Sequence, residues 1–232
     1  MTNELLLIGS LVVSYGAVLL AWRLFGKAGM YAMTAFFAVA ANVEVQILIH
    51  AFGMDQTLGN ILFAASFIIT DILSENESKK AAKTAVNIGI LTSVLFIVIS
   101  QGWLLYHPAD DGAMMEAFRM VFSGTPRIML ASIAVYVVSQ RIDVWLYHRI
   151  WALTEKKSGS AKRFLWLRNN AATLISQLIN TVLFTLGAFL GTYSFITLFY
   201  IMLSSYAIFI VTSLLDTPVV YLARRFKGKN TA

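Results

Sequence analysis

The chain of 232 residues is 58% hydrophobic and only 13% charged, with a mean hydropathy of +0.72. Because a soluble domain carries about 25% charged residues, this composition excludes an ordinary soluble protein and predicts one membrane domain, residues 1–232. The sequence contains no cysteine, which excludes disulfides and cysteine nucleophiles, and its net charge of +6 must be judged from where the charges lie.

Seven apolar runs are long enough, or nearly so, for a transmembrane helix of about 20 residues. They cover residues 5–25, 31–52, 58–73, 85–106, 128–147, 171–191 and 195–215. The first lacks the basic start of a signal peptide, so it is expected to remain as a span. The last is expected to continue past Pro218 along the membrane surface. The sequence therefore predicts an all-α polytopic membrane protein with about seven transmembrane helices.

The connections between these runs differ in character. Residues 107–125 are expected to contain a short amphipathic helix on the surface, and residues 151–168 are expected to form a flexible linker. Of the 18 lysines and arginines, 15 follow the first, third, fifth and seventh runs. Since cytoplasmic loops are enriched in these residues, the N-terminus is predicted outside and the C-terminus inside. The positive charge then faces the lipid surface, and no nucleic-acid partner is expected.

We single out ten ionisable or amide side chains that lie within the apolar runs or directly beside one. A charge at the bilayer centre costs about 2.5–3.5 kcal/mol, so such residues require compensation. They either bond to one another between helices or line a polar cavity. The ten are Asn42, Glu44, Gln46, Asp71, Gln140, Arg141, Asp143, Gln177, Asn180 and Asp216.

The fifth and sixth runs share the spacing Ser-Gln-x-x-Asp/Asn, in Ser139 to Asp143 and in Ser176 to Asn180. Residues three apart share a helix face. Counted from the basic boundary, Gln140 and Gln177 lie at one depth, about 13 Å into the membrane. With Asn42 slightly higher, they predict a polar layer formed by three helices.

Such a layer suits the polar edge of a heterocyclic base, because amides and a carboxylate offer donors and acceptors in fixed directions. Tyr136, Phe184 and Tyr206 could stack on the face of the ring. The alternative is that these amides only join helices, at about 0.6 kcal/mol for each hydrogen bond.

The remaining charged residues point to gating or to structural roles. Arg141 lies about 100° around the helix from Gln140, so an ion pair with Glu44 or Asp71 is expected. Asp71 and Glu75 could form a gate or a proton or cation site. Arg127 either anchors its helix at the interface or gates the entrance. The histidines are widely separated and no phosphate-binding loop is present, so neither a metal site nor enzymatic activity is expected.

An ordered set of motifs resembles the queuosine precursor transporter family, also called the vitamin uptake transporter family. The motifs are Thr70-Asp71-Ile72-Leu73-Ser74-Glu75, Pro126-Arg127, Ser139-Gln140 with Asp143, Arg168-Asn169-Asn170, and Ser176-Gln177. The resemblance implies a six-helix core, residues 28–232, similar to the substrate-binding components of energy-coupling-factor transporters. It also implies that residues 1–27 form an extra N-terminal span.

The resemblance further implies uptake of 7-cyano-7-deazaguanine, 7-aminomethyl-7-deazaguanine or queuine for tRNA modification. The family's polar positions correspond to Asp71, Glu75, Arg127, Gln140, Asp143, Asn170 and Gln177. Many members carry Asp where this chain has Asn180, which offers a single carbonyl acceptor to a guanine-like edge. Either Asp143 supplies the anion, or the preferred precursor differs.

We therefore expect a secondary transporter or facilitator in the bacterial inner membrane. No cofactor is expected, and a homodimer is possible. The residues expected to bind substrate are Asn42, Gln46, Tyr136, Gln140, Asp143, Asn170, Gln177 and Asn180. Those expected to gate or to couple ions are Asp71, Glu75, Arg127 and Arg141. The alternatives are a substrate-binding subunit of an ATP-driven importer, and a membrane scaffold or sensor.

Overall fold

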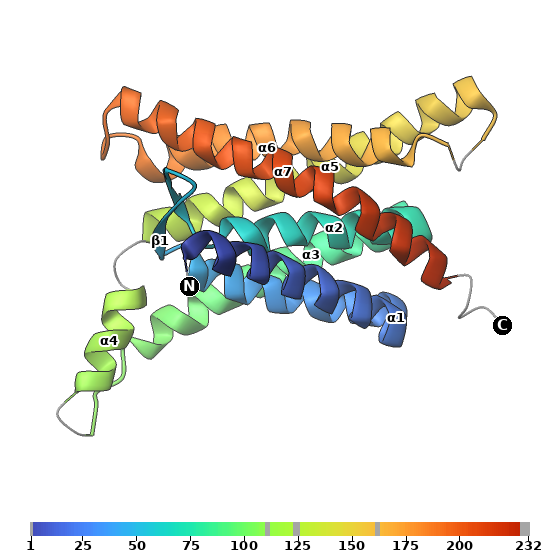
Figure 1. Cartoon of the computed structure of the whole chain (residues 1–232). Coiled ribbons are helices and arrows are strands. Elements are labelled where there is room, and N and C mark those ends of the chain that lie inside the picture. The colour runs from blue at the N-terminus through green and yellow to red at the C-terminus, as the bar shows by residue number, and fades with distance from the viewer. Residues whose placement is uncertain (1, 110–111, 123–125, 161–162, 228–232) are drawn as a thin grey trace.

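The computed structural model describes residues 2–109, 112–122, 126–160 and 163–227, which form a helical bundle with one short β-hairpin (Figure 1). Among these residues, five helices are long and apolar enough to cross a membrane: α1, α3, α5, α6 and α7. The elements in chain order are α1 (Asn3–Glu44), β1 (Leu48–Ala51), β2 (Met54–Thr57), α2 (Asn60–Asn76), α3 (Lys79–Trp103), α4 (Ala113–Phe122), α5 (Pro126–Ser158), α6 (Leu165–Phe189) and α7 (Phe195–Lys227).

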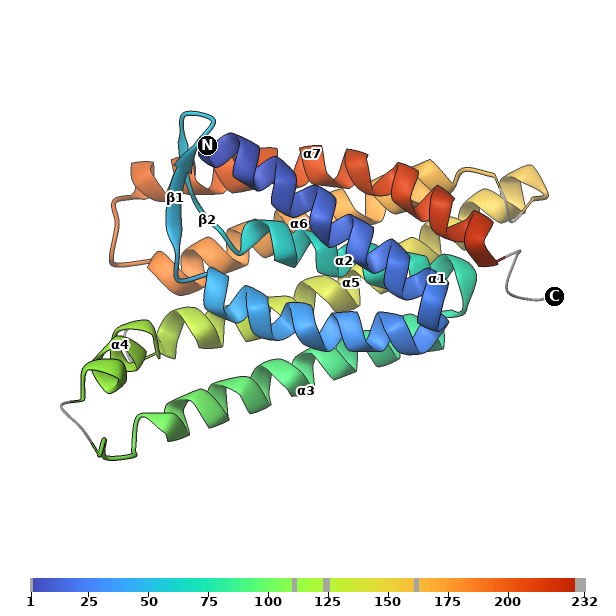
Figure 2. The ribbon, with the colours of Figure 1, turned by 60° about the horizontal axis from the view of Figure 1, so that its bottom comes forward.

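Helix α1 is two antiparallel arms that meet at Gly26 (Figure 2). Gly26 has φ +54° and ψ −134°, a backbone conformation that glycine adopts readily, and the chain reverses there. Gly29 packs so closely on the first arm that a Cβ at this position would clash with the carbonyl oxygen of Ala21. The arms, residues 3–25 and 27–44, correspond to the first predicted span and to most of the second.

The prediction that the second span continues to residue 52 is wrong, because the helix ends at Glu44 and a β-hairpin follows. The two strands are antiparallel and joined by Phe52 and Gly53, with φ of +54° and +71°. Positive φ at both positions matches the twist of a two-residue hairpin. The start of α1 holds the hairpin down: Asn3 Nδ2 donates to His50 O at 2.8 Å, and Phe52 N donates to the Glu4 carboxylate at 3.1 Å.

Helix α2 lies in the middle of the bundle, in contact with α1, α3, α5 and α7. Fourteen of its 17 residues are buried. At a rise of about 1.5 Å per residue it is about 26 Å long, slightly shorter than the hydrocarbon core of a bilayer. The chain turns after it at Ser78, whose hydroxyl accepts from Ala81 N at 3.1 Å and caps α3. Polar groups on α2 therefore face protein on all sides.

The predicted linker at residues 151–168 is mostly helical. Helix α5 continues to Ser158 and α6 begins at Leu165, while residues 161 and 162 lie outside the described residues. Helix α7 continues past Pro218 without interruption, and the placement of this last part along the membrane surface stays a prediction. The basic residue Lys229 of the tail lies outside the described residues.

The predicted amphipathic helix is present as α4, which projects away from the bundle together with the end of α3 (Figure 1). Its aromatic side chains pack on α3: the ring of Trp103 lies 5.8 Å from that of Phe118 and 5.7 Å from that of Phe122. This contact fixes α4 beside the end of α3.

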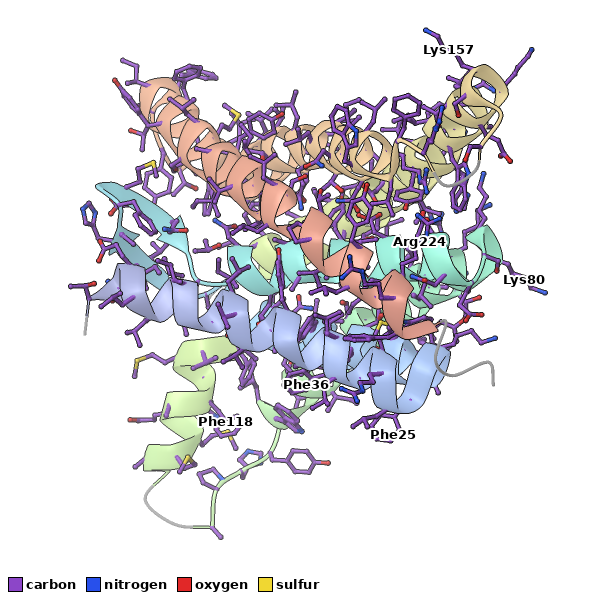
Figure 3. The ribbon with its side chains drawn as sticks, turned by 45° about the vertical axis from the view of Figure 1, so that its right-hand side comes forward. Phe25, Phe36, Lys80, Phe118, Lys157 and Arg224 are labelled. Carbon is purple, nitrogen blue, oxygen red and sulfur yellow. The ribbon has the colours of Figure 1, made fainter. Side chains whose placement is uncertain are left out.

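The bundle has two ends of different character. The N-terminus, the β-hairpin and the α6–α7 connection lie at one end, which we call the hairpin end (Figure 1). The α2–α3 turn, the α5–α6 connection and the end of α7 lie at the other, which we call the basic end. Lys80, Lys157 and Arg224 all lie toward this second end (Figure 3).

Candidate functional site

Two adjoining cavities lie beneath the β-hairpin. The first is lined by residues of several elements, among them Ala41 of α1, Thr57 of β2, Asn60 and Phe63 of α2, Ser132 of α5, Asn180 of α6 and Phe209 of α7. The second lies between α1, α2, α3 and α5. Its lining includes Asn42, Ser66, Ser93 and Tyr136, and it shares Ala41, Phe63 and Ser132 with the first.

Both cavities are small, with volumes of about 40 Å³ and about 20 Å³. For comparison, an engineered cavity of about 150 Å³ accepts benzene. Neither cavity can hold a bicyclic ring in this conformation. A ligand of that size requires the hairpin or the surrounding helices to move apart.

The walls combine amides with aromatic faces. Asn180 is buried at the first cavity, and Asn60 Nδ2 there has no hydrogen-bond partner among the described residues. Asn42 Nδ2 donates to Ala38 O at 2.6 Å and to Ser93 Oγ at 3.2 Å, which leaves its Oδ1 unbonded. Amides that lack partners in a largely apolar cavity can fix the orientation of a polar ring.

Aromatic rings meet at the junction of the two cavities. The ring of Phe63 lies 6.0 Å from that of Tyr136 and 6.2 Å from that of Phe209. Of the residues expected from the sequence, Asn42, Tyr136, Asn180 and the stacking candidate Phe184 line these cavities.

Sequence reasoning missed Thr57, Asn60, Phe63 and Phe209. The apolar ones carry no signal that separates them from ordinary core residues. Tyr206, the third stacking candidate, does not line either cavity, and its hydroxyl donates to Leu174 O at 3.4 Å.

Gln140 lies directly behind the wall of the second cavity. Its Nε2 donates to Ser66 Oγ at 2.8 Å, and its Oε1 accepts from Thr70 Oγ1 at 3.4 Å. The side chain is fully buried, and both ends of the amide bind α2 rather than α6. Gln140 therefore connects the cavity wall to the polar interior.

Three carboxyl groups lie deeper, between the cavities and the basic end. Asp143 Oδ1 accepts from Ser176 Oγ at 2.9 Å, and Asp71 Oδ2 accepts from Thr173 Oγ1 at 3.4 Å. Asp216 of α7 is the third, and neither of its oxygens has a hydrogen-bond partner among the described residues. The same is true of both amide atoms of Gln177, which is only 1% exposed.

A buried ion pair closes the basic end. Glu75 of α2 binds Arg168 of α6, and the side chains are 2% and 0% exposed. Tyr147 of α5 donates to the same carboxylate at 2.9 Å, and Arg224 of α7 approaches it to 3.5 Å. The guanidinium of Arg168 also stacks over Trp151, 4.2 Å from the ring centre. Four helices are thus fastened at one carboxylate.

Asn170, predicted to bind substrate, lies instead between α6 and α7. Its Nδ2 donates to Thr217 Oγ1 at 2.6 Å and to Trp166 O at 2.8 Å, and its Oδ1 accepts from Ser213 Oγ at 3.3 Å. Gln46 lies in the turn after α1 and lines neither cavity.

The two remaining predicted residues, both arginines, lie on α5. Arg127 fastens the start of α5 to the end of α6, through bonds to Gly187 O at 2.8 Å and Leu190 O at 2.6 Å. The expected ion pair of Arg141 with Glu44 or Asp71 does not form among the described residues. Its side chain is exposed and lies beside Lys83 and Trp145, because its helix face points out of the bundle.

Comparison with known proteins gives a consistent result. The family model described as "Putative vitamin uptake transporter" matches residues 57–223. A protein of Bacillus subtilis (strain 168) named "Probable queuosine precursor transporter" is 34% identical over 214 residues, which cover 92% of this chain and 91% of that protein. No solved structure matches the chain.

Proposed function

The chain belongs to the vitamin uptake transporter family, and we propose that it imports queuosine precursors across the bacterial inner membrane. Members of this family are transporters rather than enzymes. The substrate named for the relative supports a 7-deazaguanine compound as the cargo: 7-cyano-7-deazaguanine, 7-aminomethyl-7-deazaguanine or queuine. The mode that we propose is secondary transport or facilitation by the chain itself.

The observation that carries this proposal is the pair of cavities, in which amides and aromatic rings from different helices meet. Asn60 and Asn180 offer donors and acceptors to the edge of a flat heterocycle, and Phe63 and Phe209 offer faces for stacking. Asn180 contributes one carbonyl acceptor, so a carboxylate partner for a guanine-like edge has to come from elsewhere. Asp143 supplies it if the site expands toward the basic end.

Closure at both ends supports a transport cycle. Thr57 of the β-hairpin lines the first cavity at one end of the bundle, and the Glu75–Arg168 pair joins four helices at the other. We propose that these two contacts open alternately. Because Lys80, Lys157 and Arg224 lie toward the basic end, we propose that this end faces the cytoplasm. The two arms of α1 and helices α2, α3, α5, α6 and α7 then supply seven spans.

Binding by the purified protein tests the substrate. At a concentration of 100 times the dissociation constant, a ligand stabilises the folded form by about 2.7 kcal/mol. For a chain of this size that raises the melting temperature by about 5–10 °C. We expect this shift with 7-cyano-7-deazaguanine and not with adenine. Equal shifts with unrelated vitamins would contradict the assignment.

A variant pair locates the site. Asn180→Ala removes a buried hydrogen-bonding group, which weakens binding by about 5- to 150-fold if the contact contributes 1–3 kcal/mol. Asn87→Ala is the matched control, since Asn87 is exposed on α3 and lies outside both cavities. The measurement is uptake of labelled precursor by cells that cannot synthesise it. Equal uptake by both variants would move the site elsewhere.

Transport by the protein alone in liposomes distinguishes the proposed mode from its alternatives. A substrate-binding subunit of an ATP-driven importer binds the precursor but does not transport it without its partner. A scaffold or sensor with a merely structural polar interior neither transports nor shows the temperature shift. Transport without any added partner is the result that we expect.

A further inference from the structure

Three buried carboxyl groups on three helices have no basic partner. Asp71 of α2, Asp143 of α5 and Asp216 of α7 are each at most 1% exposed. None of them forms a salt bridge within the described part of the chain. Asp71 lies close enough to the other two for electrostatic interaction. A group of acids gathered in a membrane interior without a counter-charge requires an explanation.

Hydrogen bonds do not compensate for these carboxyl groups. Thr173 and Ser176 of α6 donate to one oxygen each of Asp71 and Asp143. The second oxygen of each has no partner among the described residues, and the same holds for both oxygens of Asp216. An ionised carboxylate in such surroundings lacks both a counter-charge and enough donors, so each group requires a proton or a bound cation.

A second, independent feature lies on the same stretch of α6. Gln177 follows Ser176 directly and lies one helical turn after Thr173, so it shares the segment that holds Asp71 and Asp143. Its amide is 1% exposed, and neither the nitrogen nor the oxygen is bonded within the described residues. A buried amide left unbonded is costly. It provides a donor and an acceptor that a protonated carboxyl group or a water molecule can use.

The geometry favours a proton over a metal cation. Within residues 2–109, 112–122, 126–160 and 163–227, no three carboxylate or imidazole groups converge closely enough to hold a metal ion. A proton needs only one carboxyl oxygen, and the cluster offers four oxygens without partners. A shared proton also relieves the repulsion between neighbouring carboxylates.

Polar residues continue from the cluster in both directions. Toward the hairpin end, Asp143 lies one turn from Gln140, which bonds to Ser66 in the wall of the second cavity. Toward the basic end, Asp71 lies one turn from Glu75, which lines an open hollow of about 350 Å³. The cluster therefore lies between the cavities and the surface that we assign to the cytoplasm.

We propose that Asp71, Asp143 and Asp216 form the proton-binding site that couples import to the proton gradient. This inference rests on the proposed function. A proton from the hairpin side adds to a carboxylate oxygen of the cluster and produces the neutral acid. The acid releases the same proton toward the basic end and becomes a carboxylate again. One proton thus enters with one substrate, and no electron moves.

The other titratable groups around the cluster are few. Tyr15 of α1 faces α7, where its hydroxyl donates to Thr212 O at 3.5 Å and lies close enough to Asp216 to interact with that carboxyl group. Tyr147, Arg168 and Arg224 are all engaged with Glu75. His148 lines the open hollow beside Glu75, so a His148→Gln variant shows whether pH dependence comes from that histidine.

The test uses the full chain in proteoliposomes with labelled 7-cyano-7-deazaguanine as the probe. Counterflow against unlabelled substrate, without any gradient, measures transport alone. An imposed gradient of one pH unit, acid outside, then supports accumulation of up to about tenfold if one proton accompanies each substrate. We expect Asp216→Asn to keep counterflow within about twofold of wild type while losing accumulation. Glu116→Gln, an exposed change on α4, keeps both and is the matched control.

Each outcome decides the proposal. If Asp216→Asn fails to fold, Asp71→Asn and substrate-driven acidification of the wild-type liposome lumen replace it. Accumulation driven by a sodium gradient, accumulation by both Asn variants, or net substrate uptake without acidification of the lumen overturns the inference alone. Failure of wild-type counterflow overturns the proposed function and this inference with it.

Discussion

The carboxylate of Glu75 is the most heavily bonded group at the basic end, and its neutralisation gives the sharpest prediction. It accepts from Arg168 Nε at 3.1 Å and again from the Arg168 Nη2 group, and from Tyr147 at 2.9 Å. In Glu75→Gln the Arg168 charge stays fully buried. It keeps a bond to Arg163 O at 2.9 Å, its contacts with the rings of Tyr147 and Trp151, and one neutral carbonyl acceptor on the new glutamine in place of the carboxylate.

Removal of one partner of a buried ion pair costs about 3–5 kcal/mol, because the other charge stays buried and unpaired. The remaining stacking on Trp151 keeps the loss near the lower bound, about 3 kcal/mol. For a chain of this size, each kcal/mol lowers the melting temperature by about 2–4 °C. We therefore expect Glu75→Gln to melt about 6–12 °C below wild type in detergent.

The reverse change is milder. In Arg168→Gln the Glu75 carboxylate keeps its bond from Tyr147, and Arg224 already lies 3.5 Å away. The Arg224 side chain is 28% exposed and can move closer. We expect about half the loss seen with Glu75→Gln, and a double variant that loses less than the two single changes together.

Thermal unfolding of the purified variants, followed by intrinsic fluorescence, measures these differences. Glu116→Gln, an exposed change of the same chemistry, gives the baseline. The reasoning fails if Glu75→Gln melts within about 2 °C of that control, or if the losses of the two single variants add without coupling.

Two further pairs of variants test packing and polar satisfaction, both by melting temperature. Gly29→Ala forces a Cβ against Ala21 and should lower the free energy of unfolding by about 1–3 kcal/mol. Gly9→Ala places its Cβ in open space and should not destabilise the protein. Equal melting temperatures of the two variants would refute the close packing of the α1 arms. Gln177→Met removes an amide without partners and should leave stability unchanged or higher while uptake falls. Gln140→Met removes two hydrogen bonds to α2 and should cost about 1–3 kcal/mol, although Ser66 and Thr70 keep their bonds to carbonyl oxygens of their own helix. The opposite ranking of the two variants would contradict this bonding.

Apolar runs predicted where the helices lie, but not how the chain turns between α1 and α2. Hydropathy counted Ile47, Leu48 and Ile49 as the end of a span, although the structure places the last two in a strand. The signal for the hairpin was local and easily missed. It consists of β-branched residues before Phe52-Gly53, a pair that can adopt positive φ in a two-residue turn. A mean over about 20 residues cannot detect such a feature.

Helical periodicity correctly predicted that Gln140, Asp143, Gln177 and Asn180 point into the protein, since all four are buried. It could not predict their partners. Gln140 binds α2, because the central position of α2 depends on how all the helices pack and not on the spacing within α5. Whether these four residues bind substrate remains a prediction.

The pattern of hydrogen bonds argues against a polar interior that serves only to hold helices together. Polar side chains that only join helices should have hydrogen-bond partners, because a hydrogen bond between helices stabilises the bundle only when both groups take part. Asn170 and Glu75 meet this expectation at the basic end. Gln177 and Asp216, deeper in the bundle, do not. Polar groups without partners at the centre destabilise this conformation, while the basic end is firmly bonded. Such an arrangement is expected where binding of a substrate or a proton offsets the destabilisation.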